Sequence, residues 1–152
     1  MGRCVDKSVY KWIKDDYCVP MEAKMSHIAV GAVGERIASD WLQRRGFVLL
    51  RRNYRVRGGE LDVVMQKDGV VHCFEVKSQT CEANFHEKGE RYRPEDHYTP
   101  AKHRNIVRAF SAYLQREHSG LETPHALHLV CVEIDHANRR AHVRVVWNVS
   151  GV

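Results

Sequence analysis

The sequence predicts an α/β fold in which a central mixed five-stranded sheet is flanked by helices. Three observations predict this class. Apolar residues recur at helical spacing in two segments, they alternate or run together at strand spacing in five others, and an Asp-Gly pair separates two of those strands. The chain has 152 residues, of which 43% are hydrophobic, and this is enough for one domain with a buried core.

The first helix is expected over residues 28–45. Its apolar residues recur every three or four positions, as on one buried helix face: Val33, Ile37, Trp41 and Leu42. Gly46 follows directly, and a glycine just beyond the last turn is a common helix terminator. The first strand is therefore expected at 47–54, where the apolar run FVLL begins.

Two further strands, 60–66 and 70–78, are predicted to form a hairpin. Asp68 and Gly69 lie between them, and this pair favours a tight two-residue turn. The segment that follows, 79–98, is polar and mixed in charge, so the sequence predicts a loop there.

A second helix is expected over 100–117. Thr99 is a favourable N-cap, and Pro100 is favourable in the first turn. Strands at 126–135 and 141–147 complete the sheet. The strand after the second helix is expected to pair in parallel, because a long crossover precedes it.

Residues 1–26 lack this periodicity and are predicted to be an extension that is poorly structured or holds a short helix near 9–14, before a single domain at 27–152. The five cysteines include no CxxC pair, and the N-terminus has no apolar stretch of signal-peptide length, so a reduced, cytoplasmic protein is expected. No apolar run approaches the ~20 residues of a membrane span, so no membrane association is expected.

A two-residue turn fixes the register of the hairpin and brings acidic residues together. Asp62 then lies opposite Glu75, and Glu60 lies opposite Lys77. Side chains directly opposite each other have Cβ atoms about 5 Å apart. Since side chains alternate along a strand, these four polar residues are expected on one face. The other face is expected to carry the core residues Leu61, Val63, Met65, Phe74 and Val76.

Opposed carboxylates destabilise a sheet unless a cation compensates. Lys77 compensates in part, and Mg²⁺ or Mn²⁺ bound between Asp62 and Glu75 would compensate more, because such ions take carboxylate oxygens. Glu35 is a further candidate acid, and Gly31 and Gly34 beside it would let another element approach closely. The alternatives are a solvated strand face with a Glu60–Lys77 pair and, for Glu35, a first-turn acid favoured by the helix dipole.

The excess of positive charge is modest, at +5, but arginines are concentrated in one segment without acids: Arg44, Arg45, Arg51, Arg52, Arg55 and Arg57. Arginine side chains match phosphate oxygens in a two-pronged geometry. The cluster is therefore a candidate nucleic-acid-binding surface, and the alternative is a solvated face.

The segment GAVGERIASDWLQRRGFVLLRRNYRVRGGELDVV, followed by FEVKSQ, resembles the YraN-like family of bacterial proteins. That family belongs to the PD-(D/E)xK, restriction-endonuclease-like nuclease superfamily. The pattern is more distantly similar to archaeal Holliday-junction resolvases, which pair an early helical Glu with a strand Asp and an E-x-K strand. The resemblance covers about 31–146 and implies a restriction-endonuclease-like α/β fold in αβββαββ order.

The resemblance also implies roles for individual residues. Asp62, Glu75 and the backbone carbonyl of Val76 would hold a Mg²⁺ or Mn²⁺ ion, Lys77 would be the catalytic lysine, and Glu35 would reach the metal or its water. Gln79 departs from the family, whose members usually have an arginine there.

The second helix opens with TPAKHRNIVRAFSAYL, which agrees with the family pattern. Lys102 and Arg104 are accordingly candidate contacts to a nucleic-acid backbone, together with Arg51, Arg52, Arg55 and Arg57; the alternative for the two helical residues is ordinary solvated cations. The implied function is a metal-dependent nuclease acting on DNA, branched or single-stranded DNA included. The alternative is a nucleic-acid-binding protein that keeps the nuclease fold with little or no hydrolytic activity. A resolvase-like activity would favour a homodimer.

Overall fold

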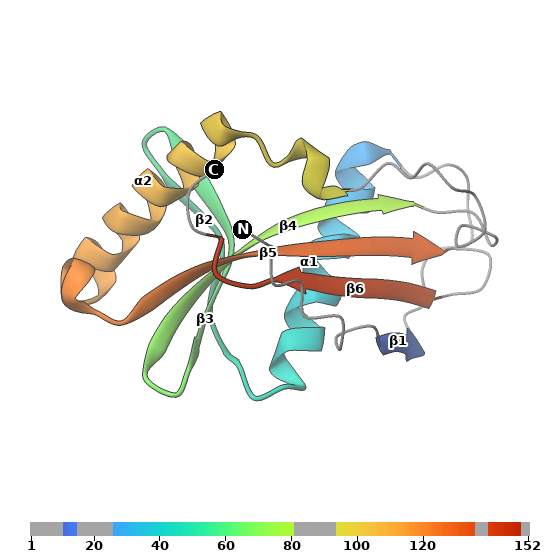
Figure 1. Ribbon diagram of the computed structural model, residues 1–152, viewed down its shortest axis with the longest axis horizontal. Coiled ribbons are helices and arrows are strands. Elements are labelled where there is room, and N and C mark those ends of the chain that lie inside the picture. Colours follow the sequence, from blue (N-terminus) through green and yellow to red (C-terminus); the bar gives the residue numbers. More distant parts are fainter. Residues whose placement is uncertain (1–10, 15–25, 81–93, 136–139, 150–152) are drawn as a thin grey trace, which may run out of the picture.

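Figure 1 shows the computed structural model, which describes residues 11–14, 26–80, 94–135 and 140–149. The elements in chain order are β1 (Lys11–Lys14), α1 (His27–Gln43), β2 (Val48–Val56), β3 (Gly59–Lys67), β4 (Val70–Thr80), η2 (Pro94–His97), α2 (Pro100–Glu117), η3 (Gly120–Glu122), β5 (His125–Asp135) and β6 (Arg140–Val146). The two predicted helices and five predicted strands are all present, with ends within two residues of the expected ones.

The strands form one mixed sheet in the order β1-β6-β5-β4-β3-β2. Strands β4 and β5 are parallel, and the other neighbouring pairs are antiparallel. The parallel pairing predicted for the strand after the second helix is thus confirmed. The crossover that makes it possible runs through η2 and α2, in front of the sheet in Figure 1.

The sixth strand, β1, differs from the sequence prediction. A short helix near 9–14 is wrong for Lys11–Lys14, which pair with β6 from Lys11↔Val143 to Lys14↔Arg140. Without β1, strand β6 would present unpaired backbone groups at the sheet edge, and these groups can template another strand. Such long-range pairing leaves no local periodicity in the sequence. The remainder of the predicted extension and residues 81–93 of the predicted loop lie outside the described residues.

The hairpin of β3 and β4 has the predicted register. Paired residues run from Lys67↔Val70 to Val63↔Phe74. Asp68 and Gly69 both have positive φ, 51° and 77°, as a turn that matches the twist of an antiparallel hairpin requires. The Asp-Gly signal therefore fixes where β3 and β4 face each other.

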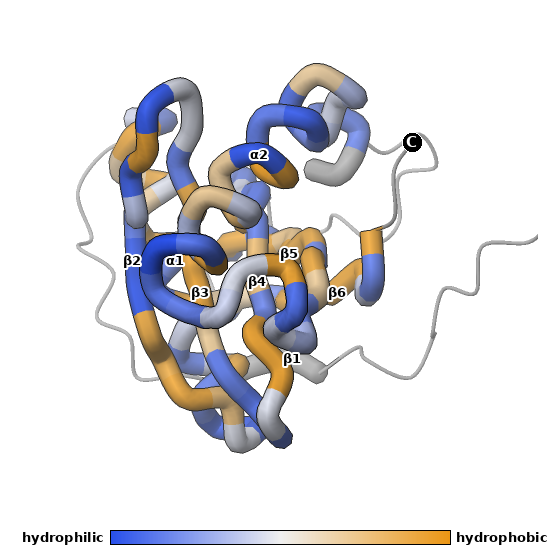
Figure 2. Tube along the Cα trace, turned by 90° about the vertical axis from the view of Figure 1, so that its left-hand side faces the viewer, coloured by the Kyte–Doolittle hydropathy of each residue, from blue (hydrophilic) through white to orange (hydrophobic). Residues whose placement is uncertain are grey.

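The two helices cover opposite faces of the sheet. The α1-side core holds Ile37, Trp41 and Leu42 of the helix against sheet residues that include Val63, Met65, Phe74 and Val76. The α2-side core holds Ile106, Phe110, Tyr113 and Leu114 against Leu61, Val64, Val71 and Cys73. Figure 2 shows the hydrophobic central strands beneath both helices and a hydrophilic stretch in the middle of β2.

One predicted core position lies on the other face. Alternation along the strand predicts Leu61 beside Val63, but Leu61 packs with Val64 in the α2-side core. Strict alternation would put Leu61 and Val63 on the same face, so the alternation of β3 is broken at Asp62. The predicted polar face is also more buried than expected, because α2 covers Val64 and Cys73, which are at most 1% exposed. The break at Asp62 lies where the candidate site is found.

Candidate active site

The β3–β4 ladder ends at the two predicted metal ligands. Its last pair is Val63↔Phe74, and the next pair in this register would be Asp62 and Glu75. At that point the carboxylate of Asp62 accepts a hydrogen bond from the backbone N–H of Val76, with Oδ2 and N 2.8 Å apart. A side chain thus substitutes for a backbone acceptor, and Asp62 is held beside Glu75, as predicted.

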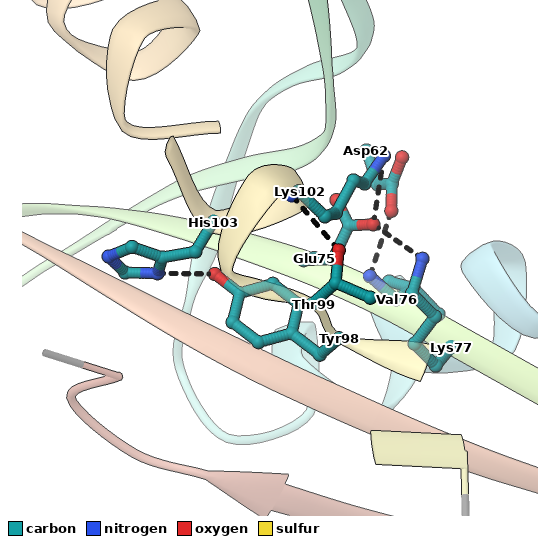
Figure 3. Close-up of polar contacts among 8 residues, drawn as sticks. All are labelled: Asp62, Glu75, Val76, Lys77, Tyr98, Thr99, Lys102 and His103. Carbon is teal, nitrogen blue, oxygen red and sulfur yellow. Dashed lines mark hydrogen bonds and ion pairs between the residues drawn. The ribbon is translucent and has the colours of Figure 1, made fainter. Parts of the chain in front are cut away.

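Glu75 is the most buried acid of the site. It is 2% exposed, and its Oε1 receives two ammonium groups, from Lys77 at 2.8 Å and from Lys102 at 3.2 Å. Its Oε2 is buried and has no hydrogen-bond partner among the described residues. Figure 3 shows both lysines directed toward Glu75, with Asp62 next to it. A buried carboxylate oxygen without a donor is rare, because its desolvation is then uncompensated.

The carboxyl of Asp62 holds a proton more tightly than an ordinary aspartate. Burial raises its pKa from 3.8 to about 7, and the charge of Glu75 and a side-chain hydrogen bond between the two carboxyl groups add to the effect. The hydrogen bond from the Val76 N–H acts in the opposite direction without cancelling it. Near neutral pH the Asp62–Glu75 pair therefore tends to keep one proton, and a cation would take its place.

The donor set of this pair fits a hard divalent cation. Two adjacent carboxylates, one with a buried oxygen that no described group binds, supply the ligands that Mg²⁺ or Mn²⁺ takes while keeping several waters. Within the described residues there is no group of three or more His, Cys, Asp or Glu side chains arranged to hold a metal. Water and a backbone oxygen would have to complete the coordination. The Val76 carbonyl stays a prediction for that position.

Glu35 reaches the same acidic cluster from α1. Burial raises its pKa, as do the charges of Glu60 and Glu75, while a hydrogen bond from Asn53 and the charge of Arg52 oppose the rise. Strand β4 lies close to α1 here. A Cβ on Gly34 would overlap the side chain of Ser78, whose Oγ donates to the Val30 carbonyl at 3.1 Å.

The close approach expected of the two glycines beside Glu35 is therefore confirmed for Gly34. It is wrong for Gly31, since a Cβ built there would have no atom of another described element within 4 Å. Only one of the two glycines faces the sheet, and the sequence does not distinguish them.

The predicted Glu60–Lys77 pair is not formed among the described residues. Glu60 is paired with Arg55 of β2 at 3.2 Å, and Lys77 is paired with Glu75 on its own strand. The β3–β4 ladder has ended before these positions, so Glu60 and Lys77 are not held opposite each other. Lys77 nevertheless contacts Glu75, and its catalytic role stays a prediction.

Sequence reasoning missed Asn53 of β2. The ladder with β3 pairs Arg52↔Val63 and Tyr54↔Leu61, so Asn53 lies across from Asp62 at the point where β3 alternation breaks. Its φ is 48°, a left-handed conformation that asparagine tolerates better than most residues, and its side chain binds Glu35. An asparagine inside a predicted strand was the available signal.

The first turn of α2 brings two more residues to the site. Thr99 caps the helix, accepting a hydrogen bond from the Lys102 N–H at 3.2 Å, and Lys102 reaches Glu75. Tyr98, which sequence reasoning missed, lies beside them in Figure 3 with its hydroxyl 2.8 Å from Nδ1 of His103. Burial and the charge of Glu75 raise the pKa of Tyr98 to about 12. No sequence motif marks this tyrosine.

Four arginines of the candidate nucleic-acid-binding surface lie on or just after β2, at the open edge of the sheet, whereas Arg44 and Arg45 lie at the C-terminal end of α1. Arg51 is paired with Glu117 at 3.3 Å, Arg52 with Asp40 at 3.8 Å and Arg55 with Glu60 at 3.2 Å. Arg57, and Arg104 on α2, are exposed. The surface is positively charged but partly neutralised, and its role in binding stays a prediction.

Comparison with known proteins shows that the chain is similar to members of an uncharacterised protein family. The model of the uncharacterised protein family UPF0102 matches residues 34–143, a range that includes every acid and lysine of the site. Over 95 residues the chain is 36% identical to a UPF0102 protein of Chlorobaculum parvum, covering 62% of this chain and 65% of that protein. It is 38% identical over 88 residues to one of Symbiobacterium thermophilum, covering 57% and 68%.

A third relative, a UPF0102 protein of Helicobacter pylori, is 32% identical over 91 residues, covering 60% of this chain and 71% of that protein. The match thus spans a little under two thirds of the Chlorobaculum parvum protein and slightly more of the other two. In the described part of the chain, no helix has the length and apolar character needed to cross a bilayer.

Proposed function

The chain belongs to the uncharacterised protein family UPF0102, and from this premise we propose that it is a Mg²⁺- or Mn²⁺-dependent nuclease that hydrolyses phosphodiester bonds in DNA. One observation carries the proposal. Asp62 and Glu75 lie side by side in a buried setting, where Oε2 of Glu75 has no partner among the described residues and two lysines lie within 3.2 Å of Oε1. Carboxylates beside ammonium groups are what metal-assisted phosphoryl chemistry requires.

The fold supports the same assignment. A mixed sheet with one parallel pair, covered by a helix on each face and built in αβββαββ order, is what a restriction-endonuclease-like nuclease requires, with β1 as an addition. In that arrangement the E-x-K strand is β4, and the acid before it is on β3. We therefore include membership of the PD-(D/E)xK superfamily, and a distant relation to Holliday-junction resolvases, in the proposal.

The reaction follows from the positions of the side chains. Hydrolysis forms a bond between a water oxygen and phosphorus, breaks the bond from phosphorus to one sugar oxygen, and leaves that oxygen with a proton. A divalent ion held by Asp62 and Glu75 would polarise the phosphate and lower the pKa of the attacking water. Lys77 orients the water and offsets the negative charge that develops on the phosphate. Glu35, whose pKa is raised by burial, would reach the metal or its water.

The test is cleavage of a panel of linear, single-stranded, flap and four-way DNA in a titration of Mn²⁺ or Mg²⁺. The wild type is expected to cleave at least one substrate only with metal, and Glu75→Gln to lose at least about 10²-fold in rate. Glu133→Gln is the matched control, because Glu133 is a largely buried glutamate on β5 with its own partners, Gln79 and His142. Equal rates for the two variants would remove Glu75 from the chemistry.

A second candidate function, nucleic-acid binding without hydrolysis, is favoured by the exposed arginines along the β2 edge. Replacing Arg51, Arg52, Arg55 and Arg57 by Gln is expected to weaken DNA affinity whatever the sequence. The slope of log affinity against log salt should fall by roughly 0.9 for each duplex phosphate that the variant no longer neutralises. Arg140→Gln, on β6 near the other edge of the sheet, is the control. An unchanged slope would mean that these arginines do not touch DNA.

DNA binding with no metal-dependent cleavage of any substrate would favour this second function over the first. A cytoplasmic location and a homodimer are also part of the proposal. Bacterial DNA lies in the cytoplasm, and a four-way junction has two-fold symmetry that a dimer would match.

A further inference from the structure

Glu75 is bound by two lysines that come from different parts of the fold. Lys77 is two residues away on the same strand, whereas Lys102 comes from the first turn of α2, and both contact Oε1. One ammonium group is enough to compensate one buried carboxylate charge. The second therefore calls for an explanation beyond the stability of Glu75.

The position of Lys102 is fixed by several contacts of α2. The Thr99 cap binds its backbone N–H, and the hydrogen bond between Tyr98 and His103 fixes the residues on either side. Farther along α2, Ala109 lies so close to Gly59 of β3 that a Cβ on that glycine would approach the alanine Cβ to 3.0 Å. The first turn of α2 is thereby held over the acidic pair.

A lysine in this place opposes the helix dipole, because cations are disfavoured at a helix N-terminus. Its ammonium group lies 3.2 Å from Oε1 of Glu75 and is directed at the acids of the site, as Figure 3 shows.

Lys102 is also the more accessible of the two lysines. Its side chain is 39% exposed, against 24% for Lys77 and 2% for Glu75. A cation held by Asp62 and Glu75 would neutralise the Glu75 carboxylate that now binds Lys102. Its ammonium group would then be free to meet an anion arriving from solvent, and the phosphate of the substrate is such an anion.

On the basis of the proposed nuclease function, we propose that Lys102 is a further catalytic residue, whose ammonium group donates a hydrogen bond to a non-bridging oxygen of the scissile phosphate. This differs from a contact to the DNA backbone at a distance from the reaction, because the charge on that oxygen grows as the reaction proceeds. A donor at such a position contributes mainly to the rate of the chemical step and little to binding.

The experiment compares Lys102→Met, which keeps an unbranched stem, with Lys102→Arg, which keeps the charge. Single-turnover cleavage at saturating DNA is expected to slow by about 10²-fold in Lys102→Met and to recover by about tenfold in Lys102→Arg. Arg108→Met, an exposed arginine farther along α2 that has no assigned role, is the matched control and should cleave at the wild-type rate. Thermal melting of each variant establishes that it is folded.

Calorimetric Mn²⁺ binding without DNA gives a readout that does not depend on activity. Lys102→Met should bind Mn²⁺ within about threefold of the wild type, or more tightly, because Asp62 and Glu75 remain and a neighbouring positive charge is gone. Loss of Mn²⁺ binding in this variant would overturn the proposal, since Lys102 would then act by holding Glu75. Wild-type cleavage rates in a folded Lys102→Met would overturn it as well, and would leave the nuclease function intact. A wild type that cleaves nothing would overturn both.

Discussion

Two pairs of titratable side chains, each with one buried and one partly buried member, lie on opposite faces of the sheet, and they differ in how their hydrogen bonds are completed. His72 and His128 lie on the α1 side among Phe47, Phe74 and Trp147. Asp62 and Glu75 lie on the α2 side. Both pairs bring together residues from neighbouring strands of one sheet. Position in the fold therefore does not by itself distinguish a pair that only stabilises the core from a pair that forms a functional site.

The histidine pair is closed, in the sense that each of its ring nitrogens has a hydrogen-bond partner within the protein. The Asn148 N–H donates to Nδ1 of His128 at 2.9 Å, so the His128 proton is on Nε2 and is donated to Nδ1 of His72, also at 2.9 Å. His72 in turn donates to the backbone carbonyl of Lys67. Every ring nitrogen of the pair has a partner, and a neutral, fixed pair of rings completes the core.

The carboxylate pair is open. Within the described part of the chain Oε2 of Glu75 has no partner, and the pKa of Asp62 is raised to about 7 by burial and by the charge of Glu75. A fully hydrogen-bonded network rigidifies a core. A buried polar group without a partner instead indicates a position where a ligand supplies the missing hydrogen bond or coordination. The difference between the two pairs distinguishes packing from a candidate site.

The two pairs also give opposite pH dependences. Burial and the charge of His72 lower the pKa of His128 from 6.5 to about 3, so the unfolded chain binds more protons there, and this contribution to stability is lost as pH falls from about 6.5 toward 3. Asp62, with its pKa raised from 3.8 to about 7, behaves in the reverse way. Its contribution is lost as pH rises from about 4 through 7.

The largest expected effect comes from opening the closed pair. His128→Ala leaves the Asn148 N–H and Nδ1 of His72 without partners and creates a cavity among aromatic rings. The free energy of unfolding at pH 7 should fall by about 4 kcal/mol. Urea denaturation at several pH values measures it, and the loss should shrink toward pH 4, where wild-type His128 is already unfavourable. A loss below about 1 kcal/mol, the size of one ordinary hydrogen bond, would show that the histidine chain is not structural.

Neutralising the open pair should act in the opposite direction. Asp62→Asn keeps an oxygen to accept the Val76 N–H and removes the buried charge. Without metal at pH 8 it should raise the free energy of unfolding by about 4 kcal/mol, since the pKa of Asp62 is raised from 3.8 to about 7 and each pKa unit corresponds to about 1.4 kcal/mol, and the gain should vanish near pH 4. Denaturation in EDTA at pH 4, 6 and 8 tests this, with Glu117→Gln as an exposed acid control. A gain that is equal at all three pH values would contradict the assigned cause.

The smallest of the three effects concerns α1, which covers the histidine face and also carries Glu35 to the acids. Gly34→Ala places a Cβ on the side chain of Ser78 and should lower the free energy of unfolding by about 2 kcal/mol. Gly31→Ala is the matched control in the same helix and should be stabilising by about 0.5–1 kcal/mol, because its Cβ meets no atom of another described element within 4 Å.

A double-mutant cycle of Gly34→Ala with Ser78→Gly separates the contact from the helix. If the overlap is the cause, the loss in the double variant should be smaller than the sum of the two single losses by at least about 1 kcal/mol. Additive losses would mean that α1 and β4 are not held together at this point.

Much of this protein is determined by the sequence itself. The helices, the five main strands and the β3–β4 register follow from periodicity, from the Thr99 cap and from the Asp68–Gly69 turn, all of which act between residues close in the chain. The positions of Asp62, Glu75 and Lys77 in one site follow from that register together with the alternation of side chains.

Only the tertiary structure decided how the site is completed. The ladder stops at Val63↔Phe74 because the Asp62 carboxylate takes the Val76 N–H, so Glu60 pairs with Arg55 instead of Lys77. Asn53, Tyr98 and Lys102 are brought to the acids by the close packing of α1, β2 and α2, and β1 joins the sheet by pairing with β6. These contacts join residues far apart in the chain, and the competing partners of each group are comparable in energy. Tertiary packing determines which partner each group binds, and no local sequence pattern predicts that partner.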